Sequence, residues 1–181
     1  MKNGLIATLF GGLVAGALDI LYAFVVYGPL SFGLTPQQVL QSVAAGWIGR
    51  DASRDGGWNT ALLGLGTHFM LATIMAGVFV LAASKVDALK KNAVLSGLIY
   101  GLILYVTMNY VVVPLSHAGA NPGFASSFGD AAERLQTSFS KVRGGGGDDY
   151  PWLIWGTIFT HTVLVGLPIA LINKRFTSQQ A

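Results

Sequence analysis

Residues 4–27 read GLIATLFGGLVAGALDILYAFVVY, an apolar run that contains a single charged residue, Asp19. A helix needs about 20 apolar residues to cross the hydrocarbon core of a bilayer, so this run is long enough to span it. Three further apolar runs follow at residues 58–83, 93–113 and 151–172, and none of the four contains Lys or Arg. The sequence therefore predicts an all-α membrane protein with four transmembrane helices.

The overall composition agrees with that expectation. Of the 181 residues, 52% are hydrophobic and only 10% are charged, which is too few charges to cover a soluble domain of this size. The formal net charge of +3 is small and its basic residues are dispersed, so nucleic acid is not expected as a partner. The chain has no cysteine, which excludes disulfides and thiolate metal sites. The lipid bilayer is the partner that the composition predicts.

The sequence contains an internal repeat. The motif Gly-Leu-x-x-Gly begins at Gly12 and again at Gly97, and the tripeptide Pro-Leu-Ser follows at 29–31 and at 114–116. A shift of 85 residues superposes both motifs without a gap. Small residues allow membrane helices to approach closely, so the glycines of the two motifs are expected at helix contacts. These glycines are Gly12, Gly16, Gly97 and Gly101.

The second helix of each copy carries a central Thr-His pair, at 67–68 and at 160–161, related by a shift of 93 residues. Repeat 1 then covers about residues 4–83 and repeat 2 about residues 93–173. Two helices per copy is an even number, so both copies enter the membrane from the same side. We expect one integral membrane domain, residues 1–181, made of two parallel helix-hairpin repeats.

The charges predict the orientation in the membrane. Basic residues concentrate at both chain ends and in the short middle loop, where Asp87 is the only acid, whereas the two long loops balance their charges. The positive-inside rule then places both termini in the cytoplasm and both long loops on the outer side. The concentrated basic residues are Lys2, Lys85, Lys90, Lys91, Lys174 and Arg175.

Each long loop is expected to contain an amphipathic helix. Thr35-Pro36 is a helix-start signal, with Thr as N-cap and Pro at the first helical position. Apolar residues recur at helical spacing in both loops, so each helix could lie on the membrane surface or cap the helix bundle. The two stripes are Val39, Leu40, Val43, Ala44, Trp47 and Ile48 in the first loop, and Phe124, Phe128, Leu135, Phe139 and Val142 in the second.

Three ionisable residues are predicted to share one depth. His68 and His161 each follow a tryptophan at the outer start of their helix by nine or ten residues. At 1.5 Å per residue, both histidines lie roughly 15 Å below the outer surface, near the bilayer centre. Asp19 falls at a similar depth and shares a helix face with Gly12 and Gly16. The three side chains are therefore expected to point into the bundle.

An ionisable group at this depth is a candidate functional group, because leaving it unpaired in the bilayer costs several kcal/mol. Asp19, His68 and His161 could bind a ligand or line a path for a proton or a small solute. The alternative is that neutral histidines join helices through hydrogen bonds. The polar residues expected to assist the site are Thr67, Thr160 and Asn109.

Two other classes of protein remain open. His68 and His161 could bind a metal or serve as the axial ligands of a b-type haem, with Asp19 as a third ligand or as an orienting group. Alternatively, the small-residue faces could pack against a second copy or a larger membrane complex, which would make the protein an accessory or structural subunit. An enzymatic site is not favoured, because no nucleophile with an adjacent base is recognisable.

Two positions depart from a simple duplicated bundle. The shift of 85 residues places Leu104 opposite Asp19, so the repeat is symmetric in its histidines but not in its acid. Pro168 lies inside the fourth helix and is expected to kink it, which would release a carbonyl near residue 164.

The order of these motifs resembles the YagU-type family of small bacterial inner-membrane proteins. The shared layout is a Gly-x-x-x-Gly first helix, a Thr-His second helix, a third helix that runs into Pro-Leu-Ser, and a fourth helix that ends in Lys174-Arg175. It covers most of the chain outside the long loops. The resemblance implies a bacterial inner-membrane location and histidines in helices two and four, here His68 and His161, but no established activity. Asp19 departs from the pattern of the family.

Overall fold

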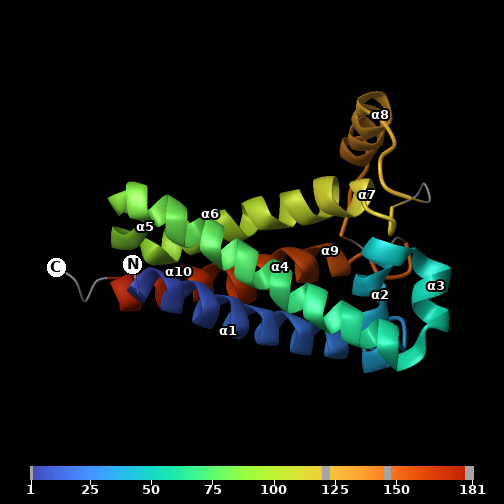
Figure 1. Ribbon diagram of the computed structural model, residues 1–181, viewed down its shortest axis with the longest axis horizontal. Coiled ribbons are helices and arrows are strands. Elements are labelled where there is room, and N and C mark those ends of the chain that lie inside the picture. Colours follow the sequence, from blue (N-terminus) through green and yellow to red (C-terminus); the bar gives the residue numbers. More distant parts are fainter. Residues whose placement is uncertain (1, 120–122, 145–147, 178–181) are drawn as a thin grey trace. The chain divides into compact units, whose positions relative to one another are not determined.

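The computed structural model of the chain describes residues 2–119, 123–144 and 148–177 (Figure 1). These residues are mostly helical and contain no strand. In chain order the helices are α1 (Lys2–Val26), α2 (Pro36–Ile48), α3 (Arg50–Asp55), α4 (Gly57–Lys85), α5 (Asp87–Lys91), α6 (Ala93–Val106), the π-helix η1 (Thr107–Val112), α7 (Val113–Leu115), α8 (Phe128–Phe139), α9 (Leu153–Phe159), the π-helix η2 (Thr160–Gly166) and α10 (Leu167–Thr177).

Within the described residues, four helical stretches are long and apolar enough to cross a membrane, which confirms this part of the predicted fold. Large apolar side chains are exposed along them, for example Leu21 at 59%. Surfaces of this kind need an apolar surrounding, so the chain is a multi-pass helical membrane protein in contact with lipid. The four spans are Lys2–Val26, Gly57–Lys85, Ala93–Leu115 and Leu153–Thr177.

The chain divides into two compact units, and each unit draws on both predicted repeats. Unit 1 comprises Met1–Tyr22, His68–Tyr105 and Ile158–Ala181. Unit 2 comprises Ala23–Thr67 and Val106–Thr157. The candidate residues Asp19, His68, Thr160 and His161 therefore belong to unit 1, whereas Thr67 and Asn109 belong to unit 2.

Small side chains dominate the core of unit 1. With no water to exclude, membrane helices associate through close van der Waals packing, and alanines permit that closeness. Leu104, which the predicted repeat places opposite Asp19, is one of the four members larger than alanine and is 6% exposed. The core consists of Ala15, Ala76, Phe79, Ala83, Ala93, Leu104, Val165, Ile169 and Ala170.

Glycines bring pairs of helices in unit 1 into backbone contact. A Cβ atom added at Gly12 of α1 would lie 2.5 Å from the Cα atom of Thr73 in α4. A Cβ atom added at Gly101 of α6 would lie 2.4 Å from the Cα atom of Thr162 in η2. No side chain fits at such distances without moving the helices apart. Two further glycines make similar approaches, Gly16 to Phe69 and Gly97 to Leu167.

In unit 2, α2 is held against the first turns of α4. Thr35 caps α2 through a capping box, in agreement with the helix-start signal in the sequence. The amide of Gln41 donates to the carbonyl of Gly57 at 3.0 Å. A Cβ atom added at Gly64 would lie 1.9 Å from the carbonyl oxygen of Leu40. Gly64 is thus the residue that allows α2 to approach α4.

The second long loop contains α8, which is stabilised at its start by local hydrogen bonds. The hydroxyl of Ser127 accepts the backbone N–H of Asp130 at 3.1 Å. Arg134 Nε donates to Asp130 Oδ1 at 2.7 Å, and this hydrogen bond holds the pKa of Asp130 below its usual value. Each long loop therefore contains a helix. Whether these two helices lie on the membrane surface or cap the bundle stays a prediction.

Candidate functional site

Three of the predicted polar residues meet in unit 1, from α1, α4 and η2. The hydroxyl of Thr160 donates to Asp19 Oδ1 at 2.6 Å. The other carboxylate oxygen, Oδ2, lies 4.0 Å from His68 Nδ1. The side chain of His68 is 12% exposed and that of Asp19 is 28% exposed. The carboxylate of Asp19 thus faces groups from two other helices.

The hydrogen bond at the far side of the His68 ring fixes its tautomer. His68 Nε2 lies 2.8 Å from the carbonyl oxygen of Gly16. A carbonyl oxygen can only accept a hydrogen bond, so Nε2 must carry a proton. Neutral His68 therefore has its lone pair on Nδ1, the nitrogen that faces Asp19.

This arrangement sets two acceptors opposite each other. An ionised Asp19 and a neutral His68 would present lone pairs across the 4.0 Å gap. One added proton, on either the carboxylate or Nδ1, would make one of the two groups a hydrogen-bond donor to the other. The gap exceeds the length of a direct hydrogen bond, so a small side-chain movement or a bridging water would complete the contact. The pair is suited to holding one proton.

Gly16 supports the site in two ways. Its carbonyl accepts from His68, and its lack of a side chain allows α4 to approach, because a Cβ atom there would lie 2.8 Å from Cδ1 of Phe69. The repeated Gly-Leu-x-x-Gly motif predicts that Gly16 lies at a helix contact, but it indicates no role for the carbonyl of Gly16. A backbone acceptor leaves no signal in the sequence, since every residue has one.

Thr160 and His161 begin the π-helix η2, which precedes Pro168. The N–H of Leu167 at its end bonds to the carbonyl of Thr162, five residues back instead of four. Proline has no N–H and its ring crowds the preceding turn, so a widened turn accommodates it. The sequence predicts a kink at Pro168, and this kink stays a prediction. The structure shows a π-helix just before Pro168, and this π-helix carries two candidate residues.

A second π-helix, η1, precedes Pro114 in the same way and contains Asn109. The N–H of Val113 bonds to the carbonyl of Met108, again five residues back. π-helical turns are rare and are frequently found at functional sites. In this chain both π-helices contain residues that the sequence singled out for their polarity.

His161 is placed against α6. Its backbone carbonyl oxygen would lie 2.3 Å from a Cβ atom at Gly101, and its ring packs edge-on against Tyr105 with 6.0 Å between ring centroids. In unit 2, Thr67 accepts a hydrogen bond of 2.9 Å from Trp47 Nε1. In the sequence Trp47 belongs to an apolar stripe, which does not reveal this hydrogen bond, although a partly buried indole N–H usually needs an acceptor.

The geometry of the site does not add support to the alternatives of a metal site or a haem site. Within the described residues, no group of three or more His, Cys, Asp or Glu side chains is arranged to hold a metal ion. His68 Nε2 bonds to the carbonyl of Gly16, so Nδ1, which faces Asp19, is the nitrogen of this ring that has a lone pair for a metal ion.

Comparison of the chain with models of known families, with curated proteins and with solved structures found no match. The class of the protein is therefore defined by its own fold and site. It is a multi-pass membrane protein whose described helices bring one acid, one imidazole and one hydroxyl together inside unit 1.

Proposed function

We propose that the protein passes protons through the membrane by way of the site formed by Asp19, His68 and Thr160. The observation that carries this proposal is the carboxylate of Asp19, which accepts from Thr160 on one oxygen and faces His68 Nδ1 with the other. Ionisable groups inside a membrane are expensive and are typical of proton and ion pathways.

The hydrogen-bond geometry supports a single exchangeable proton. Thr160 donates to Asp19 whether or not that proton is present, and Gly16 holds the Nε2 proton of His68 in place. The proton that can come and go is then the one between Asp19 Oδ2 and His68 Nδ1. Two facing acceptors offer this proton two positions, one on the carboxylate and one on the imidazole, and general acid–base groups exchange protons in this way.

The rival reading, an accessory or structural subunit, receives less support. It relies on glycine faces that are open to a partner helix. Gly12, Gly16, Gly97 and Gly101 all face other helices of the same chain, where a Cβ atom would come within 3 Å of them. These glycine faces pack against helices of the same chain, so no partner helix or second copy is needed to cover them.

Proton flux into liposomes that contain the purified protein tests the proposal. Under an imposed pH gradient, followed with an enclosed pH-sensitive dye, the native protein should dissipate the gradient faster than protein-free liposomes. Asp19→Asn and His68→Gln should each reduce the rate to that of protein-free liposomes, because each removes one of the two groups that share the proton.

Matched controls are available outside the spans. Asp87→Asn repeats the acid-to-amide change at a residue that pairs with Lys90, and His117→Gln repeats the histidine change in the second long loop. Both should keep the native rate. A native protein that transports no faster than empty liposomes, or an Asp19→Asn variant that transports at the native rate, would overturn the proposal.

A further inference from the structure

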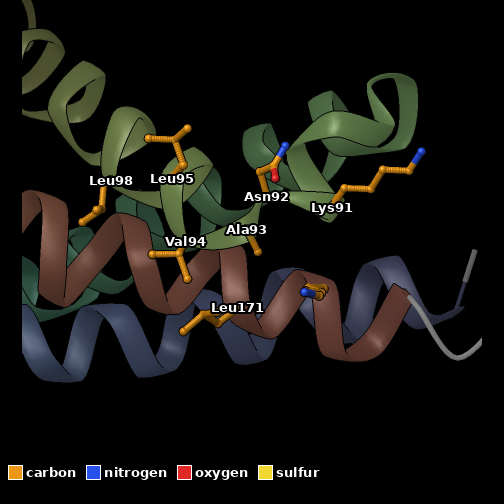
Figure 2. A pocket seen from close by; sticks show the side chains of 8 residues that line it. Lys91, Asn92, Ala93, Val94, Leu95, Leu98 and Leu171 are labelled. Atoms are coloured by element: carbon orange, nitrogen blue, oxygen red, sulfur yellow. The ribbon is translucent and has the colours of Figure 1, made fainter.

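A groove opens in unit 1 where α5 meets the start of α6, beside the last turns of α10 (Figure 2). Its volume is about 410 Å³. Figure 2 shows Val94, Leu95, Leu98 and Leu171 along its length, with Asn92 and Lys91 toward one end. The lining consists of Lys91, Asn92, Ala93, Val94, Leu95, Leu98, Leu171 and Lys174.

The groove is amphiphilic along the direction of the helices. Its apolar part lies within the membrane-spanning stretches, and Val94, Leu95 and Leu171 are 56%, 60% and 44% exposed there. Its polar part begins where the third span begins, with Lys91 and Asn92 just before Ala93. A ligand that matches this surface has a charged or polar head and an apolar tail.

The charge at the polar end is positive. Asp87 is the only acid that the sequence places among the basic residues of this end. It is occupied by Lys90, whose Nζ atom lies 2.8 Å from Asp87 Oδ1, and this pairing lowers the pKa of Asp87 so that it stays ionised. Lys90 does not line the groove, whereas Lys91 and Lys174 do. Lys91 also interacts electrostatically with Asp87 and helps to lower its pKa, so the one negative charge of Asp87 is shared between two lysines. Lys90, Lys91 and Lys174 thus carry three positive charges against this one acid, and the net charge at this end is positive.

We propose that this groove binds an anionic phospholipid of the surrounding bilayer. The phosphate lies at Lys91 and Lys174, with the amide of Asn92 as a further donor, and an acyl chain covers Val94, Leu98 and Leu171. Basic pockets at the ends of membrane helices recognise anionic lipid head groups in this way. A zwitterionic lipid would bring its own ammonium group to the two lysines, so the groove should select lipids with net negative charge.

Native mass spectrometry of detergent-purified protein tests the proposal. The protein is first equilibrated in vesicles that contain equal amounts of phosphatidylglycerol and phosphatidylcholine. The native protein should retain phosphatidylglycerol with an enrichment of about tenfold or more over phosphatidylcholine. The double variant Lys91→Gln/Lys174→Gln should lose that enrichment.

The double variant Lys2→Gln/Lys85→Gln is the matched control, because it removes two charges from unit 1 without touching the groove. It should keep the native enrichment. Equal enrichment in the native protein and in Lys91→Gln/Lys174→Gln, or an equal loss in both double variants, would overturn the proposal. Displacement of the lipid by millimolar inorganic phosphate would also contradict it, since that result would assign the lysines to free phosphate. A thermal melt of each variant verifies that the fold is retained.

Discussion

At the scale of single residues, Asp19 depends on one hydroxyl. Thr160→Val removes the hydrogen bond of 2.6 Å and leaves Asp19 Oδ1 without that donor in an apolar surrounding. We expect a loss of about 1–2 kcal/mol in the free energy of unfolding, measured by denaturant titration in detergent micelles. Proton flux should fall as well, because the carboxylate is no longer held toward His68.

Thr162→Val is the appropriate comparison for this measurement. It makes the same change two residues later in η2, where the hydroxyl donates to the carbonyl of Ile158, four residues back in the same membrane span. We expect it to unfold at nearly the native denaturant concentration and to keep the native flux. Equal effects of the two substitutions would show that the interaction between Thr160 and Asp19 contributes nothing specific.

The residues of the site were predictable to different degrees. The spacing of Gly12, Gly16 and Asp19 puts the acid on the face that packs closely, so its inward position follows from the sequence. The helical register of His68 indicates the same for the histidine. The roles of the Gly16 carbonyl and of the Thr160 hydroxyl as the direct partner of Asp19 do not follow, because they depend on the rotation of one helix against another.

At the scale of helices, two glycines of similar sequence context should respond to alanine in opposite directions. Gly101→Ala should cost about 1–3 kcal/mol in the free energy of unfolding, because its Cβ atom would lie 2.3 Å from the carbonyl oxygen of His161. At Gly66 a Cβ atom would meet no atom of the described residues within 4 Å. Gly66→Ala should therefore stabilise α4 by up to about 1 kcal/mol through helix propensity.

Thermal unfolding in the same detergent, followed by circular dichroism, compares the two variants directly. A stabilising effect of Gly101→Ala would mean that α6 and η2 are farther apart than the structure shows. Destabilisation by Gly66→Ala would indicate that another surface, of lipid or protein, covers this face of α4.

The long helices were the most predictable part of the fold. The predicted run 93–113 and the span Ala93–Leu115 begin at the same residue, because the charged residues before Ala93 end the apolar pattern on that side. The π-helices were not predictable as such, since η2 continues the same apolar pattern as the α-helix before it. Pro114 and Pro168 mark their neighbourhood, but a proline alone does not distinguish a kink from a π-turn.

At the scale of the whole molecule, the orientation in the membrane is testable because the chain has no cysteine of its own. Ser84 and Ser140 are both exposed, and each hydroxyl donates to a carbonyl three residues back in its own segment, that of Leu81 and that of Thr137 respectively. In intact cells, a membrane-impermeant maleimide should label Ser140→Cys, whereas Ser84→Cys should be labelled only after the membrane is opened. The reverse pattern would invert the proposed topology.

The duplication of the hairpin stays a prediction. If the two copies are superposed by the repeat shifts, one close glycine contact in the first copy corresponds to one in the second. The shifts of 85 and 93 residues carry Gly16 onto Gly101 and Phe69 onto Thr162. Gly16 approaches Phe69, and Gly101 approaches Thr162. The acid has no such counterpart, because Leu104 occupies the equivalent place in the core. One molecule should therefore carry one proton site and not two.

The position of Asp19 along α1 connects this site to the electrical potential of the membrane. Asp19 lies seven residues before Val26, the last residue of α1, which corresponds to about 10 Å of helix. Measured from this helix end, a proton that reaches Asp19 crosses about a third of a hydrocarbon core that is about 30 Å thick, which is less than the depth of about 15 Å that the sequence predicts. A full crossing is worth about 2.3 kcal/mol per 100 mV, so about 0.8 kcal/mol per 100 mV acts on this proton. The proton-binding constant of the site should then change about fourfold for every 100 mV of membrane potential.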